Sequence, residues 1–318
     1  MFSAAWNNNI GWWEKRVKKK EGEEGMNQRN IRINEERCIL CGDCIDVCTR
    51  GIIELGNESA RIKDPARCIL CGHCKSICPE DAPELGPLNP HEFQPLPPKD
   101  QNPQPENLMS FFRSRRSVRF FKKDPVRQED LETIVQAGRF APTGGNRQPV
   151  CYVMLHTPEM IENVRSKTVI FLGEEAAKIL AAAERHKKFG DPLPPRAEVK
   201  LGYAPLWKGL EKLYQRGKDL LFYFAPAVAV LHLDPKKASP FGTDAGLAAM
   251  QMVLMAEALG LGTCFCGFLT SALNSSLDLK KILQIPEEHD VLLSFMIGHP
   301  NVKFLRNVSR NAARVKFL

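Results

Sequence analysis

The sequence has no long hydrophobic run and few aromatic residues. Phe, Trp and Tyr make up 8% of its 318 residues, and the longest apolar run, residues 220–231, contains Pro226. A transmembrane helix needs about 20 consecutive apolar residues, so the sequence predicts no membrane span. Near the N-terminus, the basic run KRVKKK follows the few apolar positions, which is the reverse order of a secretory signal. We therefore expect a cytoplasmic protein.

Acidic side chains are in deficit. The chain has 37 Asp and Glu residues against 44 Lys and Arg residues, which gives a formal net charge of +7. This balance suits an anionic partner, such as a nucleotide phosphate or an acidic redox protein, and it does not single out nucleic acid. With 43% hydrophobic residues, the chain is long enough for one large or two unequal domains, each with its own core.

Cysteine, by contrast, is abundant, and its spacing indicates metal ligation. Eight of the eleven cysteines stand in two copies of the pattern CxxCxxCxxxC, and every cysteine of the first copy recurs thirty positions later. Two copies predict two similar sites. Thiols that bind metal must stay reduced, which again indicates a reducing compartment. The eight residues are Cys38, Cys41, Cys44, Cys48, Cys68, Cys71, Cys74 and Cys78.

The spacing favours two 4Fe-4S clusters over structural zinc. Three closely spaced cysteines in a loop reach three irons of one cluster, whereas the fourth, on the following helical turn, ligates the other cluster. A tetrahedral zinc site would leave the third cysteine of each motif in surplus. The predicted ligand sets are Cys38, Cys41, Cys44 and Cys78 for one cluster, and Cys68, Cys71, Cys74 and Cys48 for the other.

The repeat resembles the bacterial two-cluster ferredoxins over residues 31–86. Every ligand is present, and Pro79 follows the last cysteine as it does in those proteins. Thr49 stands where a second proline usually follows Cys48. The resemblance implies transfer of single electrons, for which the rest of the chain should supply a donor or an acceptor.

A proline-dense stretch separates this region from the rest of the chain. Residues 83–105 hold eight of the 23 prolines, which predicts an extended, semi-rigid connection. Translation that starts at Met26 would omit most of the residues before the repeat. The predicted organisation is a disordered extension over residues 1–30, a two-cluster domain over 31–86, a linker over 87–107 and a second domain over 108–318.

In the second domain, apolar periodicity predicts strands that alternate with helices. Leu131, Ile134 and Val135 recur at helical spacing after Asp124-Pro125. Residues 245–259 are apolar almost all the way round, which predicts a helix buried in a core or in a subunit interface. A more polar helical cap is expected over residues 174–220, and strands are expected from Pro149, over 227–233 and over 291–297.

The segment RSRRSVRFF, residues 113–121, is a candidate phosphate site. Guanidinium groups bind phosphate in a bidentate manner, and serine hydroxyls add short donors. Taken alone, the segment also fits a nucleic-acid patch or a solvated run of charge. Three later blocks favour phosphate: APTGGNRQP with its amide side chains, the glycine-rich LGLGTCFCGF, and a basic segment with Lys303, Arg306 and Arg310.

These four blocks, in this order over residues 108–315, resemble the nitroreductase family of FMN enzymes. The resemblance implies an α+β fold, in which helices flank a central, mostly antiparallel sheet. It also implies an intimate homodimer with FMN at each subunit interface. Arg115, Arg116, Ser117 and Arg119 match the phosphate-binding segment of the family, and Arg310 matches the later basic residue that completes it.

The resemblance assigns the remaining flavin contacts to two other blocks. One subunit is expected to contribute a loop to the flavin of the other subunit. Its matching residues are Pro142, Thr143, Gly144, Asn146 and Gln148. Cys266 and Gly267 fall where the family places backbone against the redox-active side of the isoalloxazine ring.

The remaining cysteine thiols and three scattered histidines are assigned no chemistry. Cys264 and Cys266 fit small buried side chains in an apolar, glycine-rich turn, and Cys151 fits a core position in its strand. The histidines without ligand spacing are His156, His232 and His299.

Together, the two regions predict an oxidoreductase in which a donor reduces the clusters, the clusters reduce FMN, and FMN reduces a planar acceptor such as a nitroaromatic or a quinone. The chemistry of the family resides on the flavin, so no catalytic side chain is predicted. The expected donor is a ferredoxin-type protein, and NAD(P)H is a second candidate. The alternative function is an electron-transfer adaptor that docks on a larger redox complex and has no small-molecule substrate.

Overall fold

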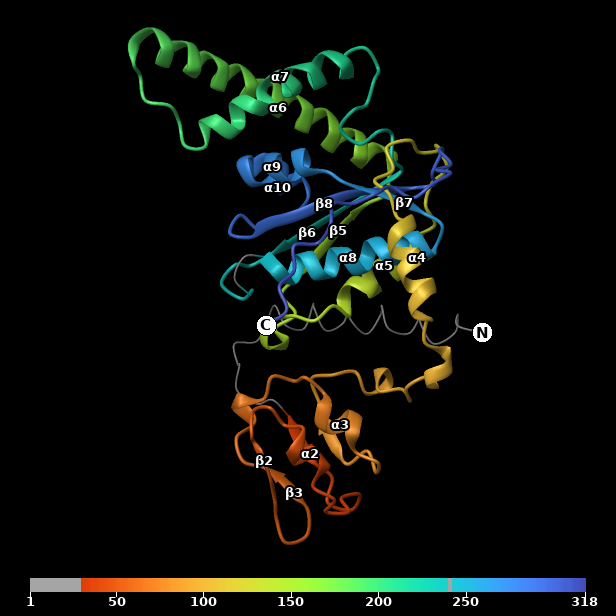
Figure 1. The fold of residues 1–318 in the computed structure, drawn as a ribbon. Helices are drawn as coiled ribbons and strands as arrows, with labels where there is room; N and C mark the ends of the chain where they lie inside the picture. The colour runs from red at the N-terminus through yellow and green to blue at the C-terminus, as the bar shows by residue number, and fades with distance from the viewer. Residues whose placement is uncertain (1–29, 240–241) are drawn as a thin grey trace. The chain divides into compact units, whose positions relative to one another are not determined.

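The computed structural model describes residues 30–239 and 242–318. The predicted extension over residues 1–30 lies outside the described residues, apart from Asn30. The described chain forms two compact units, which meet in the sequence between Asp100 and Gln101, inside the predicted linker. Figure 1 shows the first unit in red and orange and the second in yellow to blue.

Two short strand pairs frame the first unit. Strand β1 (Ile31–Ile33) pairs antiparallel with β4 (Pro83–Leu85), and β2 (Ile53–Leu55) pairs antiparallel with β3 (Ala60–Ile62). Their inward side chains meet the cysteine motifs in a small core. The first and last strands of the unit therefore hold its two ends together around the repeat.

The two helices of the first unit begin in the same way. Helix α2 (Asp43–Asp46) follows Gly42, and α3 (His73–Ile77) follows Gly72. Both glycines have left-handed backbones, with φ of 86° and 78°, which glycine adopts without steric cost. Each glycine stands directly after the second cysteine of its motif, so the two copies of the repeat fold alike.

Part of the predicted linker packs on the first unit. It contains the 3-10 turns η2 (Pro90–Glu92) and η3 (Lys99–Gln101). A Cβ atom placed on Gly72 would lie 3.1 Å from the ring of Phe93, so that ring lies directly against the start of α3. The connection is therefore not extended over its whole length, because its apolar side chains find a core within reach.

A four-stranded sheet forms the centre of the second unit. Its spatial order is β5 (Cys151–Leu155), β6 (Ala227–Leu233), β8 (Asp290–Gly298) and β7 (Gly262–Phe265), and every neighbouring pair is antiparallel. The three predicted strands are present. Strand β7 falls in the block that we predicted as a glycine-rich turn, because its four residues are too few to show a period.

Helices cover both faces of this sheet (Figure 1). Helices α5 (Gln128–Arg139) and α8 (Thr243–Ala258) lie on one face, and α9 (Gly267–Ser275) and α10 (Leu277–Ile282) lie on the other. Alternate side chains of β6 enter two separate cores: Ala229 and Leu231 face α8, whereas Val228 and Val230 face the α9 side. This arrangement is the α+β sandwich that the sequence predicted.

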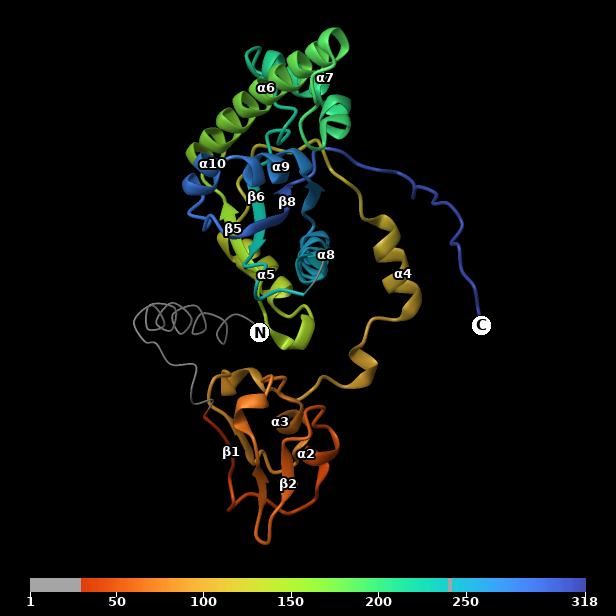
Figure 2. The same ribbon diagram turned by 90° about the vertical axis from the view of Figure 1, so that its left-hand side faces the viewer.

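A long helical hairpin extends beyond the α9–α10 layer (Figure 2). It consists of α6 (Pro158–Phe189) and α7 (Ala197–Tyr214). Thr157 caps α6 by accepting the backbone N–H of Met160, and Gly190 ends it in a left-handed conformation. The predicted cap over residues 174–220 is therefore a hairpin, and its first helix begins earlier than the sequence indicated.

Helix α8 is not buried on every side within one copy of the chain. Ala248 and Met252 are buried in the core, whereas Leu247 and Met250 are 42% and 41% exposed. An apolar face of the helix thus remains uncovered. Within the described part of the chain, no helix has both the length and the apolar character needed to cross a bilayer.

Candidate iron-sulfur and flavin sites

The eight motif cysteines line two separate cavities in the first unit. Each cavity contains four thiols, three from one motif and one from the other. The first is lined by Cys38, Cys41, Cys44 and Cys78, and the second by Cys48, Cys68, Cys71 and Cys74. These are the two sets that the spacing rule predicted.

The backbone turns toward the sulfur atoms in both motifs. Leu40 and Leu70, at equivalent positions, have left-handed backbones with φ of 61° and 55°, a conformation that is uncommon and strained for residues other than glycine. The N–H of Leu70 donates to Sγ of Cys68 at 3.3 Å, and the N–H of Ala60 donates to Sγ of Cys38 at 3.3 Å. Hydrogen bonds to sulfur are a main determinant of cluster potential.

Without a bound metal, these thiols do not readily lose their protons. Burial and the neighbouring Cys38 and Cys41 raise the pKa of the Cys44 thiol. Burial, together with Cys68 and Cys71, raises the pKa of Cys74 to about 11, against a backbone hydrogen bond that lowers it. Iron bound in the cavity offsets this cost, because a coordinated thiol is deprotonated by the metal charge. The residues present therefore fit two four-cysteine clusters.

In the second unit, the predicted phosphate segment lies along strand β7. It follows helix α4 (Pro105–Ser114). The N–H of Val118 donates to the carbonyl oxygen of Thr263 at 2.9 Å. A Cβ atom on Gly262 would lie 2.7 Å from Cγ2 of Val118, so glycine at this position permits the close approach. Ser117 and Arg119, on either side of Val118, are exposed and free to face a ligand.

The structure brings two of the predicted arginines together. Nη1 of Arg116 donates to the carbonyl oxygens of Arg113 and Arg115 at 2.6 and 2.7 Å, and its Nη2 donates to that of Arg306 at 3.4 Å. Arg310 lies further along the exposed C-terminal segment and donates to the carbonyl oxygen of Ser309. The role of Arg310 in phosphate binding thus stays a prediction.

Glu257, in the last turn of α8, lies beside this basic segment. Burial raises the pKa of its carboxyl group, while Arg115 and Arg116 oppose that shift. Nothing in the sequence singled out this glutamate, because it stands within a helix that was notable only for its apolar residues. An anion bound by these arginines would compete with the carboxylate of Glu257 for their positive charge.

The second predicted flavin block is a compact loop anchored on the other end of α8. The loop contains the turn η4 (Gly144–Asn146). Buried Asp244 accepts the N–H of Gly144 at 3.0 Å with one carboxylate oxygen and that of Ser239 at 2.9 Å with the other. Burial alone would raise the pKa of Asp244, but these hydrogen bonds lower it overall.

Two further hydrogen bonds shape the end of this loop. The backbone N–H of Gln148 donates to Oγ1 of Thr143 at 3.0 Å, and its side-chain amide donates to Oδ1 of Asn146 at 3.3 Å. Pro142 and Gln148 are exposed. The loop therefore presents amide groups at the surface of the unit, where a flat heterocycle can reach them. Sequence reasoning missed Asp244, whose position at the start of a buried helix was its one signal.

Within a single chain, the two halves of the predicted flavin site lie far apart. The loop is tied to Asp244 in the first turn of α8, and the arginines lie beside Glu257 in its last turn. These positions are about 20 Å apart along a helix that rises 1.5 Å per residue. One copy of the chain thus does not bring the loop to its own arginines.

The third block places Cys266 and Gly267 at the junction of β7 and α9. Cys266 is 5% exposed, its N–H donates to the carbonyl oxygen of Ser294 at 2.8 Å, and burial raises the pKa of its thiol to about 12. Cys264 is also buried, so both are small core residues, as predicted. Gly267 is exposed and borders a cavity of about 440 Å³, whose polar lining includes Thr270 and Asn274.

Two residues to which the sequence analysis assigned no chemistry lie close together in the structure. Cys151 was predicted to be a core residue of its strand, and His232 was set aside because it showed no ligand spacing. The structure brings Cys151 beside His232 and a third residue, His289, into one cluster. Sequence spacing gave no signal because Cys151 and His232 lie on different strands and His289 precedes a third, so the three residues meet only when the sheet has formed.

Comparison with known proteins is consistent with this division. The profile of the Nitroreductase family matches residues 112–299, and that of the 4Fe-4S dicluster domain matches residues 37–82. An NADPH-flavin oxidoreductase of Vibrio harveyi is 26% identical over 195 residues, which cover 61% of this chain and 66% of that protein. Nitroreductase NfnB of Mycolicibacterium smegmatis is 25% identical over 48% of this chain and 67% of its own.

Among solved structures, a nitroreductase with bound FMN from Bacteroides fragilis has a TM-score of 0.49 and 18% identity. That likeness covers 67% of this chain and 98% of the solved one. The family profile alone spans more than half of the chain and includes β5 to β8. The chain belongs to the nitroreductase family and carries a 4Fe-4S dicluster domain ahead of its nitroreductase domain.

Proposed function

We propose that this chain is an iron-sulfur flavoprotein oxidoreductase, which passes electrons from a donor through two 4Fe-4S clusters to FMN and then to a small planar acceptor. The observation that carries the proposal is the presence of two four-thiol cavities in the same chain as a nitroreductase domain. Clusters transfer electrons one at a time, and a flavin, when bound, converts them into two-electron chemistry.

The protein's own part in this function is to hold and separate the cofactors. Cys78 and Cys48 cross between the motifs and complete the two ligand sets. Arg115, Arg116, Ser117 and Arg119 bind the flavin phosphate, with Arg306 and Arg310 as later partners. Guanidinium and hydroxyl donors of this kind match the charge and geometry of a phosphate.

FMN binding requires a second copy of the chain. The loop that contains Pro142, Thr143, Gly144, Asn146 and Gln148 is too far from the arginines of its own chain, as the length of α8 indicates. A homodimer solves this problem, because each copy brings its loop to the arginines of the other. The uncovered apolar face of α8, with Leu247 and Met250, supports such an interface.

The proposed electron donor is a reduced protein of the ferredoxin type. Two large apolar side chains that line the first cluster cavity are exposed, Ile39 at 60% and Leu40 at 40%, and Ile77, which precedes Cys78 in the chain, is 43% exposed. Apolar residues clustered around a redox site suit transient docking of a partner protein. NAD(P)H remains a second candidate donor, in line with the name of the Vibrio relative.

The acceptor is a small planar molecule, such as a nitroaromatic or a quinone, that stacks on the flavin. Gly267 leaves space for it, since nothing lies within 4 Å of a Cβ atom placed there. No side-chain acid or base is assigned, because the chemistry takes place on the flavin. The eight reduced cysteines fit the cytoplasm as the compartment.

The test is a composition and reduction experiment on protein purified without oxygen. We expect about eight irons and about one FMN per chain. Reduced ferredoxin, added stepwise, should bleach the cluster absorbance and then the flavin absorbance. Iron without flavin, after FMN has been supplied in excess, would refute the enzyme function and leave an electron-transfer adaptor.

A further inference from the structure

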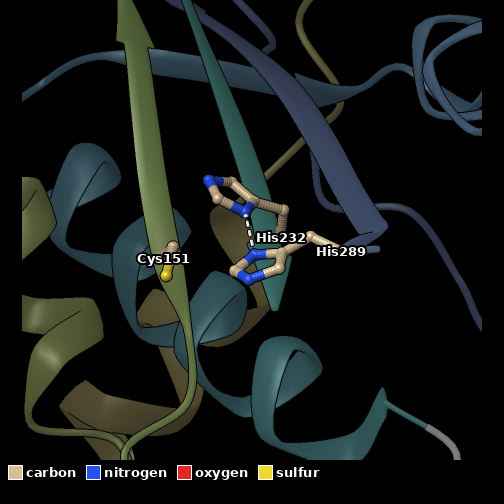
Figure 3. Close-up of side chains that lie close together, drawn as sticks. All are labelled: Cys151, His232 and His289. Atoms are coloured by element: carbon tan, nitrogen blue, oxygen red, sulfur yellow. Dashed lines mark hydrogen bonds between the residues drawn. The ribbon is translucent and has the colours of Figure 1, made fainter. Parts of the chain in front are cut away.

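Three residues with metal-binding side chains meet at one end of the sheet in the second unit. Cys151 begins β5, His232 stands near the end of β6, and His289 directly precedes β8 (Figure 3). Cys151 and His232 are directly opposite each other in the antiparallel register. One sulfur and one nitrogen from each imidazole lie within 4.8 Å of one another.

The two imidazoles are hydrogen-bonded to each other. Their Nδ1 atoms lie 2.8 Å apart, and the dashed line in Figure 3 marks this hydrogen bond. One Nδ1 must donate and the other must accept, so one lone pair points at the partner ring. A metal ion between the rings would need both lone pairs, which requires the donating imidazole to move its proton to Nε2. The nitrogens would separate to about 3.3 Å, the spacing set by Zn–N bonds of about 2.0–2.1 Å.

The cluster is partly buried, and Lys280 of α10 lies near it. His232 is 6% exposed, and Cys151 and His289 are partly buried. Its charged neighbours have other partners. Nζ of Lys280 donates to the carbonyl oxygens of Glu287 and His289 at 2.9 and 2.6 Å, and Lys237 pairs with Asp234 at 3.2 Å. Both lysines therefore interact with groups other than the imidazoles.

We propose that Cys151, His232 and His289 bind one zinc ion. Borderline-soft zinc takes thiolate sulfur together with imidazole nitrogen, whereas magnesium and calcium require oxygen ligands that this group does not contain. Binding releases the thiol proton to solvent and leaves each imidazole neutral, with its proton on the nitrogen that is not bound. Three protein ligands leave the fourth tetrahedral position to water.

The site is distinct from the eight motif cysteines and from the flavin residues. It joins β5, β6 and the segment before β8 at one end of the sheet. Gln148 of the flavin loop stands three residues before the start of β5 at this end. Zinc therefore acts as a brace for this end of the sheet. Because it binds the folded state alone, zinc should raise the unfolding temperature of the second unit.

X-ray absorption at the zinc edge of the full chain, with its iron clusters in place, tests the proposal. Iron does not contribute at this edge. We expect about one zinc per chain, with one sulfur at about 2.3 Å and two nitrogens at about 2.0–2.1 Å. Cys151→Ser and His289→Gln should lose this zinc and its thermal shift. His156→Gln, an exposed histidine after β5, is the matched control and should keep both.

Three results would overturn the proposal. A first shell of sulfur alone would place the zinc on cluster cysteines. Equal zinc in wild type and Cys151→Ser would show that this thiol is not a ligand. Copper bound in preference to zinc would assign the same three side chains to a different metal, since two imidazoles and a thiolate also suit copper. The zinc-edge spectrum of the wild type decides the first outcome, and a copper-edge spectrum of the same sample decides the third, even if a variant fails to fold.

Discussion

Asp244 links the core of the second unit to the loop that we assign to the flavin. Its two carboxylate oxygens accept the backbone N–H groups of Gly144 and Ser239 from within a buried position. A carboxylate that accepts two backbone hydrogen bonds fixes the loop more firmly than neutral contacts do. The geometry of the loop therefore depends on one buried side chain outside it.

Replacing Asp244 with alanine should loosen this loop. The change leaves two N–H groups without their acceptor, and we expect the free energy of unfolding to fall by about 2–3 kcal/mol. FMN should also bind more weakly. Urea unfolding followed by circular dichroism, together with FMN titration, measures both effects. Asp278→Ala is the matched control, because that side chain is 92% exposed, and unfolding should change by less than about 0.5 kcal/mol. Equal behaviour of the two variants would contradict the assigned role of Asp244.

The crossed ligand sets predict which pairs of cysteine substitutions act together. Cys38→Ser and Cys78→Ser remove ligands of the same cluster, so each alone should lower iron from about eight to about four atoms per chain, and the double variant should lose no more. Cys38→Ser combined with Cys48→Ser should remove both clusters. Iron analysis and electron paramagnetic resonance of the reduced proteins measure this. Loss of both clusters in the Cys38→Ser, Cys78→Ser protein would contradict the crossing.

The sequence reveals those residues whose spacing is local. The eight cysteines line the two cavities in the groups that their spacing predicts, because a fourth cysteine on a helical turn points away from its own loop. Cys151 and Asp244 were missed for the opposite reason. Their partners are separated by many residues in the chain and meet them only after the sheet and α8 have formed.

Glycines set how closely the elements of the second unit pack. Gly138 lies where α5 meets α8, and a Cβ atom there would lie 2.7 Å from Cγ of Met252 and 3.2 Å from the ring of Tyr152. Gly202, on α7, has nothing within 4 Å of such an atom. The same substitution should therefore have opposite effects in these two helices.

Gly138→Ala should destabilise the second unit and Gly202→Ala should not. Overpacking at the α5–α8 contact should cost about 1–3 kcal/mol of unfolding free energy. Alanine in the exposed interior of α7 should add about 0.5–1 kcal/mol, because glycine loses more backbone entropy on folding. Thermal unfolding of the paired variants measures the difference. A stabilising Gly138→Ala would show that α5 and α8 are not in close contact.

Among the elements, long periodic segments were predicted well and short ones were not. Strands β6 and β8 are mostly apolar, and helix α8 is rich in Ala, Leu and Met, so the local pattern sufficed. Strand β7 is short, begins with glycine and is defined by its pairing with β8, which the sequence does not display. Helix α6 began earlier than expected because Thr157 and Pro158 form its cap ahead of the polar region.

The proposed flavin site depends on two copies of the chain. Leu247→Glu places a charge on the uncovered face of α8, where a single chain tolerates it because the side chain is 42% exposed. We expect the dimer to dissociate and FMN to be lost together, as measured by sedimentation and flavin content. Leu277→Glu, on α10 and 45% exposed, should change neither. Retention of FMN by a monomeric Leu247→Glu protein would contradict the shared site.

In the proposed function, electrons reach FMN through the clusters. The most direct measurement is the rate of flavin reduction by reduced ferredoxin, without oxygen, in wild type and in a Cys38→Ser, Cys68→Ser protein that lacks one ligand of each cluster. Dithionite in excess provides the control that the flavin of both proteins can be reduced. We predict that flavin reduction by ferredoxin is lost in the variant while reduction by dithionite remains. Equal rates with ferredoxin in both proteins would show that the clusters are not on the path.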